Sequence, residues 1–148
     1  MRGVLSSPSQ IDSAAMSQSP LRFRVHGERL AIARLEPEAG FPAWAQGSFV
    51  TLSRTSQELS VVCAQSSVPR EARAERDRIG LAIVGVIPMT TVGLLASLCT
   101  ALAAANVPVF VISTYDTDWI LVPVERFEAA RGALHGLGHT VSGELPEN

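Results

Sequence analysis

The apolar residues in the second half of the chain follow two different periodicities. We expect a short buried strand at GLAIVGV, where apolar residues are continuous. A helix is predicted over TTVGLLASLCTALAAAN, with Thr90 or Thr91 as its cap and Asn106 as its stop. The residues at helical spacing that predict its buried face are Leu94, Leu95, Leu98, Leu102 and Ala105.

Beyond this helix the pattern returns to strands. PVFVIST and DWILVP predict two strands joined by a tight turn near Tyr115 and Asp116. VERFEAARGALHGLG has the spacing of an amphipathic helix, and HTVSG predicts a last strand. The predicted order is βαββαβ, which suits a split βαβ, ferredoxin-like layer with two helices on one face of an antiparallel sheet.

The first half is rich in strand patterns. LRFRVHGERLAIARL alternates around His26-Gly27-Glu28 and predicts a hairpin or two short strands, while SFVTLSRT and ELSVVCAQ predict two more. FPAWAQ suggests a turn or two of helix. Residues 69–78 are highly charged, follow a Ser-Val-Pro helix-start signal and place Arg73 and Asp77 at helical ion-pair spacing, which predicts a solvated helix.

No charged residue occurs between Arg78 and Asp116, which is a length that a membrane-spanning helix requires. Pro88 interrupts this stretch early, and Asn106-Val107-Pro108 interrupts it late. The longest helix that remains is shorter than the roughly 20 residues needed to cross a bilayer. The stretch therefore predicts a buried strand-helix-strand unit, and we expect no membrane partner.

Composition narrows the classes of partner. The 148 residues are 47% hydrophobic, enough for one sizeable core or two small ones, and the net charge of −2 argues against nucleic acid or an anionic membrane surface. Cys63 and Cys99 lie in apolar runs without metal spacing, so buried thiols in a reducing compartment and no cofactor are expected. Residues 1–20, rich in Ser, Pro and Gln, are expected to be a disordered tail, with Met16 as an alternative start.

The predicted βαββαβ topology brings two loops together. Its first and second strands are parallel, so loop 85–91 and turn 113–118 share one edge of the sheet. The unpaired N–H groups expected at a helix start over residues 89–92 suit a carboxylate, and Asp118 suits an ammonium group. With the Ser113 and Thr114 hydroxyls available for orientation, the pocket matches the two ends of a zwitterion.

A simpler interpretation of the same residues stays open. Thr90 then only caps the helix, and Asp116 or Asp118 only stabilises the turn.

The run PVFVISTYDTDWILVP, preceded by the helix start IPMTTVGLLASL, resembles the ACT-domain family. Within that family it is most similar to the branch of tandem-ACT cytosolic arginine sensors and their small bacterial relatives. With GLAIVGVIP the resemblance covers residues 79–142, and residues 21–75 resemble a shorter, degenerate ACT unit. It implies an α+β fold with two tandem ferredoxin-like βαββαβ units, at residues 21–78 and 79–148.

Members of this family are non-catalytic and bind an amino acid where two ACT units meet. The resemblance therefore implies a cytoplasmic sensor that forms a homodimer and acts on a regulated protein partner. Carried over by position, it implicates residues 88–91, Thr114, Tyr115 and Asp118, to which the geometry above adds Ser113. The candidate ligand-binding residues are thus Pro88, Met89, Thr90, Thr91, Ser113, Thr114, Tyr115 and Asp118.

The side chains of the candidate pocket bear on the identity of the amino acid. Loop 86–91 lacks an acidic residue, so arginine is not favoured, and a smaller or apolar amino acid fits as well. Met89 and Tyr115 suit an apolar ligand side chain, and they equally suit core packing.

Two other functions compete with a sensor. One is a ligand-free structural module that dimerises through a sheet edge or an apolar patch. The other is a divalent-cation-dependent enzyme that uses the D-x-D pair Asp116 and Asp118, although no phosphate-binding loop accompanies that pair.

His135 and His139 have the spacing of a helical metal pair. We expect both on the surface, because Gly136 and Gly138 end the helix between them. Trp44 and Trp119 are expected to be core or interface anchors.

Overall fold

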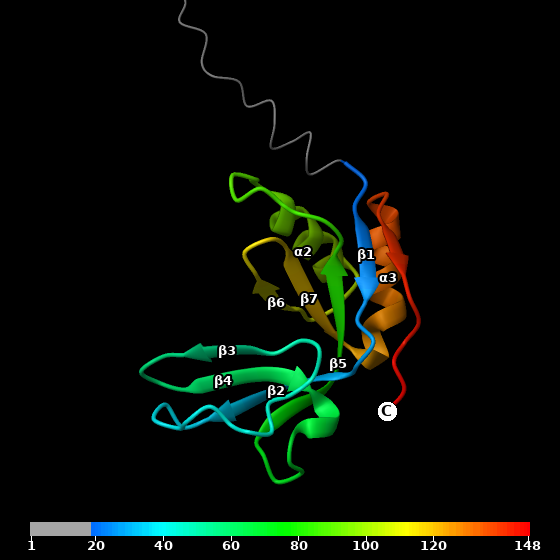
Figure 1. Cartoon of the computed structure of the whole chain (residues 1–148). Coiled ribbons are helices and arrows are strands. Elements are labelled where there is room, and N and C mark those ends of the chain that lie inside the picture. The colour runs from blue at the N-terminus through cyan, green and yellow to red at the C-terminus, as the bar shows by residue number, and fades with distance from the viewer. Residues whose placement is uncertain (1–18) are drawn as a thin grey trace, which may run out of the picture.

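The computed structural model describes residues 19–148, in which eight strands form one sheet and two α-helices cover part of one face (Figure 1). The tail expected over residues 1–20 lies outside the described residues except for Ser19 and Pro20. The elements in chain order are β1 (Arg22–Val25), β2 (Leu30–Leu35), β3 (Thr51–Arg54), β4 (Leu59–Ala64), η1 (Gln65–Ser67), β5 (Ala74–Ile83), α2 (Leu94–Ala104), β6 (Phe110–Ser113), β7 (Asp118–Pro123), η2 (Val124–Arg126), α3 (Phe127–Gly136) and β8 (Thr140–Ser142).

The second half has the element order that its sequence predicts, β5-α2-β6-β7-α3-β8. Strand β7 pairs antiparallel with both β5 and β6, so β5 and β6 run parallel, as in a split βαβ unit. One departure lies on the other side of β5, where β1 from the start of the chain is inserted between β5 and β8. The mixed α+β architecture follows from this sheet and its two helices.

The helices bury a core against one face of the sheet. Leu98 and Leu102 of α2 are fully buried, and burial of each such side chain contributes roughly 1.5–3 kcal/mol. The positive φ of Asn106, 58°, ends α2 as its sequence predicts. The other buried members of this core are Phe23, Val25, Ile79, Leu81, Ile83, Leu94, Val107, Ile120, Val122, Phe127, Ala130 and Leu134.

The first half is not a second βαββαβ unit, because no α-helix lies within residues 19–93. β1 and β2 do not pair with each other as a hairpin. Both pair antiparallel with β5, which runs across the expected boundary between residues 78 and 79. The predicted hairpin of β3 and β4 is present, and β4 extends the sheet beyond β2. The two halves therefore share strand β5.

The helix predicted for residues 69–78 is wrong, since residues 74–83 are β5, and FPAWAQ is a loop. Asp77 has a positive φ of 55° and lies where the register between β2 and β5 shifts. Its carboxylate accepts hydrogen bonds from Arg29 and Gln65, both at 3.0 Å, instead of pairing with Arg73. Pairing with β2 supplies the backbone hydrogen bonds that a helix would have made.

His139 is buried, contrary to the surface position expected from its sequence. Only 3% of it is exposed, whereas His135 is exposed. Gly138 reverses the chain with a φ of 89°, which turns His139 inward beside β1. The Leu21 N–H donates to His139 Nδ1 at 3.1 Å, and burial lowers the pKa of His139 below its ordinary value.

The buried thiol expected at Cys63 is confirmed, and Cys99 is half-buried. Among residues 19–148 there is no helix with the length and apolar character needed to span a bilayer.

The lowered pKa of His139 predicts a stability that depends on pH. The unfolded chain binds a proton near pH 6.5, but the folded chain binds it only at lower pH, so the free energy of unfolding declines as pH falls below about 6.5. We expect urea unfolding to give lower stability at about pH 5.5 than at about pH 7.5.

His139→Asn keeps a hydrogen-bond acceptor for Leu21 without a titrating ring, so it should flatten this pH dependence. His135→Asn, at the exposed histidine, should retain it. Equal pH dependence in the two variants would contradict the assignment to His139.

Candidate functional site

The loop of residues 84–93 and the turn of residues 114–117 lie at the same edge of the sheet, as their sequence predicts. The Ile87 N–H donates to the Asp116 carbonyl at 2.7 Å, which joins the loop to the turn. The Thr117 hydroxyl donates to the Ile83 carbonyl at 2.8 Å and holds the turn against the end of β5. These bonds fix the relative positions of the ends of β5, β6 and β7.

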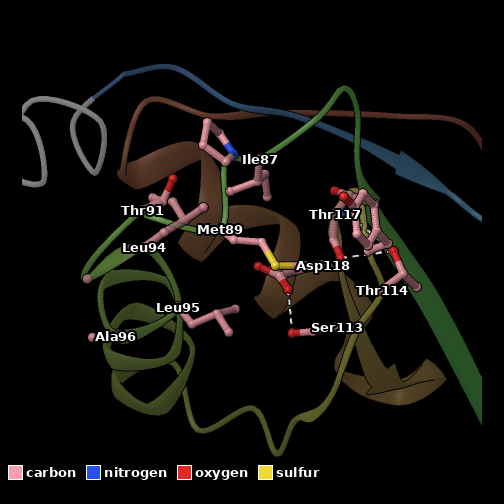
Figure 2. A pocket seen from close by; sticks show the side chains of 13 residues that line it. Ile87, Met89, Thr91, Leu94, Leu95, Ala96, Ser113, Thr114, Thr117 and Asp118 are labelled. Carbon is pink, nitrogen blue, oxygen red and sulfur yellow. Dashed lines mark hydrogen bonds between the residues drawn. The ribbon is translucent and has the colours of Figure 1, made fainter.

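A cavity of about 380 Å³ opens between this edge and the start of α2. Figure 2 shows the side chains of Met89, Leu95 and Asp118, from the loop, α2 and β7, directed toward a common space. Seven of the eight candidate residues line it, and Thr90 does not. The full lining is Ile87, Pro88, Met89, Thr91, Gly93, Leu94, Leu95, Ala96, Ser113, Thr114, Tyr115, Thr117 and Asp118.

Helix α2 begins later than its sequence predicts. Its first residue is Leu94, and Gly93 is the N-cap with a φ of 84°, so neither Thr90 nor Thr91 caps it. Residues 88–91 instead form a turn in which the Thr91 N–H donates to the Pro88 carbonyl at 3.0 Å. The unpaired amides of a helix start therefore belong to residues 94–96 and not to residues 89–92.

The first turn of α2 has the properties of an anion-receiving helix terminus. No side chain caps it and it contains no acidic residue, while Leu94, Leu95 and Ala96 all line the cavity. Its N–H groups and the positive end of the helix dipole attract a negative group. Sequence reasoning missed Leu95 and Ala96 as site residues because it placed the helix start at residues 89–92, although Gly93 is an accepted N-cap residue.

Asp118 supplies a negative group on the opposite side of the cavity. The Ser113 hydroxyl donates to Asp118 Oδ1, across the register pair that closes the β6–β7 hairpin. Thr114 is engaged within the turn, since its hydroxyl donates to the Thr117 carbonyl at 3.1 Å and accepts from the Thr117 N–H at 3.3 Å. Thr114 thus stabilises the turn, whereas Asp118 is half-buried beside the cavity.

Met89 and Tyr115 are not core residues. They are 74% and 85% exposed and line the cavity with apolar side chains that face solvent, and Val86 and Val92 of the same loop are also exposed. The core-packing alternative for these two residues is therefore wrong. They are placed to contact a ligand or another protein surface.

The two carboxylates of the D-x-D pair do not converge. Asp118 lines the cavity described above, whereas Asp116 lies in the turn and lines a different cavity. In the part of the chain that the structure describes, no group of three His, Cys, Asp or Glu residues is placed to hold a metal ion.

Two family models match the chain. Residues 73–136 match the ACT domain, and residues 28–71 match a separate model described as an N-terminal domain. The two halves of the chain thus match different family models. No curated protein matches the chain.

Solved structures share the fold over most of the chain. A structural-genomics protein from Agrobacterium tumefaciens is 27% identical, with a TM-score of 0.80 over 88% of this chain and 98% of its own. A protein of unknown function from Vibrio cholerae, described as a possible transport protein, is 21% identical, with a TM-score of 0.66 over 87% and 98%. The regulatory subunit of aspartate kinase from Thermus thermophilus is 15% identical, with a TM-score of 0.54 over 76% and 96%. Together with the ACT match, these likenesses define an ACT-like ferredoxin fold.

The left-handed N-cap predicts a measurable cost of substitution. A Cβ at Gly93 meets no atom within 4 Å, so Gly93→Ala costs only backbone strain, about 1–2 kcal/mol in the free energy of unfolding. Gly132, inside α3, also has free space around its Cβ but no positive φ. Gly132→Ala should therefore stabilise the fold by about 0.5–1 kcal/mol. Chemical denaturation measures both, and a neutral Gly93→Ala would argue against the left-handed cap.

Proposed function

We propose that this chain is a non-catalytic regulatory protein that binds an amino acid in the cavity between α2 and the β6–β7 turn. The proposal rests on one observation. The unpaired helix amides of residues 94–96 and the carboxylate of Asp118 lie on opposite sides of one cavity. The amides would receive the ligand carboxylate, and Asp118 would receive its ammonium group. The cavity volume of about 380 Å³ is in the range of small-ligand pockets.

The apolar side chains that line the cavity suggest which amino acids fit. Ile87, Met89 and Leu95 offer apolar contacts, and loop 86–91 holds no acidic group to pair with a guanidinium. A small or apolar amino acid is therefore the preferred ligand over arginine. A guanidinium in this cavity would lose its hydration without gaining a carboxylate partner, which disfavours arginine.

The exposed side chains of Met89 and Tyr115, here called the apolar rim, suggest how ligand binding is transmitted to a partner. Met89 and Tyr115 would be covered by a second copy of the chain, so that the ligand lies between two ACT units of a homodimer. A ligand that binds one dimer arrangement better shifts the equilibrium toward it, and this alters contact with a regulated protein partner. The aspartate kinase neighbours are regulatory subunits or carry such units, which supports a regulatory role. The free thiols of Cys63 and Cys99 suit the cytoplasm.

A ligand-free dimerisation module is the second candidate, and the same exposed rim favours it. A cation-dependent enzyme is not favoured, because Asp116 and Asp118 line different cavities.

Ligand binding should raise the melting temperature of the chain. At about 100 times its Kd, a ligand specific for the native state adds roughly 2.7 kcal/mol, so thermal unfolding against each of the twenty amino acids identifies it. Asp118→Asn should abolish the shift while the unliganded melting temperature stays close to that of the parent. Glu125→Gln, which removes an exposed carboxylate outside the cavity, should keep the shift. If no amino acid shifts the melting temperature at millimolar concentration, amino-acid binding is wrong and the ligand-free module remains, to be tested by sedimentation.

Dimer formation through the apolar rim is tested by sedimentation. Met89→Glu places a charge on the exposed rim, so we expect the chain to shift from dimer to monomer without loss of fold. Leu137→Glu, at a 39% exposed apolar residue after α3, is the matched control and should leave the dimer intact. A parent chain that sediments as a monomer at every concentration, with and without ligand, would remove the dimer from the proposal.

A further inference from the structure

A second cavity, of about 400 Å³, lies on the face of the sheet opposite α2 and α3. Along β1, Phe23 and Val25 face the helices, so the pleat directs Arg24 to the other face. Along β7, Ile120 faces the helices and Trp119 the other face. The residues that line this cavity are Arg24, His26, Ala82, Ile83, Val84, Gly85, Val86, Asp116, Thr117 and Trp119.

Trp119 forms the aromatic wall of this cavity, and other aromatic side chains pack against it. The Trp119 ring lies 4.1 Å from the Phe49 ring and 5.4 Å from the His26 ring, measured between centroids. His26 Nε2 is in turn 3.4 Å from Ser48 Oγ and 3.5 Å from Glu28 Oε2. These contacts hold the indole in position as one wall of the cavity.

Two opposite charges line the same cavity without partners. Neither the Arg24 guanidinium nor the Asp116 carboxylate forms a hydrogen bond or ion pair within residues 19–148. By contrast, Arg29 pairs with Asp77 and Arg131 with Glu128. The guanidinium can bind a carboxylate through two parallel hydrogen bonds, and the Asp116 carboxylate can accept from an ammonium group.

We propose that this cavity is a second ligand site, for an amino acid with a flat aromatic side chain. Arg24 binds its carboxylate, Asp116 binds its ammonium group, and the side chain stacks against Trp119. Arg24 and Trp119 both lie beside Ala82 of β5, so the sheet sets their spacing, and the β6–β7 turn brings Asp116 to the same cavity. This site is distinct from the cavity at the start of α2, and no residue of the α2 amide group contributes to it.

Trp119 makes the site directly observable. The chain has 2 tryptophans, so Trp44→Phe leaves Trp119 as the only indole. In that background, L-phenylalanine should change the Trp119 fluorescence in a saturable way. Two probes each lack one charge: 3-phenylpropanoate has no ammonium group, and 2-phenylethylamine has no carboxylate. We expect each to bind at least tenfold more weakly than phenylalanine.

Arginine variants test the carboxylate contact. Arg24→Ala and Arg24→Lys should each weaken phenylalanine binding at least tenfold, because lysine keeps the charge but lacks the paired donors. Arg22→Ala removes an exposed arginine two residues earlier on the same face, outside the cavity, and should have no effect. Circular dichroism confirms that each variant is folded. Absence of a saturable response to phenylalanine at millimolar concentration, or equal effects of Arg22→Ala and Arg24→Ala, would overturn the proposal.

The test separates this site from the proposed regulatory cavity. Asp118 does not line the second cavity, so Asp118→Asn should leave the fluorescence response to phenylalanine unchanged. If Asp118→Asn abolishes that response, phenylalanine binds at the start of α2 and the second site is wrong. In the thermal screen, a shift that Asp118→Asn abolishes comes from the regulatory cavity, whereas a shift that survives Asp118→Asn and is lost in Arg24→Ala comes from the second cavity, so the two proposals fail separately.

Discussion

The hydrogen bonding of β5 is the constraint on which the rest of the structure depends. This strand pairs with β1 and β2 along one edge and with β7 along the other, so it joins the two halves of the chain. Gly80 lies at its centre, where a Cβ would be 3.1 Å from Leu30 Cδ1 and 3.2 Å from His26 Cβ. A side chain there would push away the connection between β1 and β2. The halves therefore meet closely because this position has no side chain.

The end of β5 also explains why two cavities lie back to back. Its alternate residues face opposite sides of the sheet, so Ile83 packs against the helices while Ala82 lines the open face. The turn of residues 114–117 crosses this end, and Thr117 lines both cavities. Their chemistry differs because one face is covered by a helix start, with its free amides, and the other has only strand side chains. One end of the sheet thus carries two chemically different cavities.

The elements that local periodicity specifies could be predicted from the sequence, and those that depend on distant partners could not. The apolar spacing of α2 and the β6–β7 strands is contained within each segment. Residues 69–78 are charged at helical spacing, but pairing with β2 makes the later part of this segment a strand. Seven of the eight candidate residues line one cavity because the second half has the predicted βαββαβ order. The unpaired helix amides belong to residues 94–96 and not to residues 89–92, because Gly93 and not a threonine caps α2. The second cavity joins Arg24, Ala82 and Trp119, whose proximity no local pattern indicates.

The hydrogen bond from the Ile87 N–H to the Asp116 carbonyl connects two segments that line both cavities and also reach the outer surface of the protein. It joins the loop of residues 84–93 and the turn of residues 114–117 into one unit. A ligand in either cavity can favour one arrangement of this unit only by contacting it differently in each arrangement. The loop also carries Val86 and Val92, which are 72% and 64% exposed, so any change in it alters an apolar surface that a partner can recognise. In the proposed regulatory function, coupling between ligand and partner requires no transmission through the buried core, because the loop that lines the cavities also carries the exposed apolar side chains.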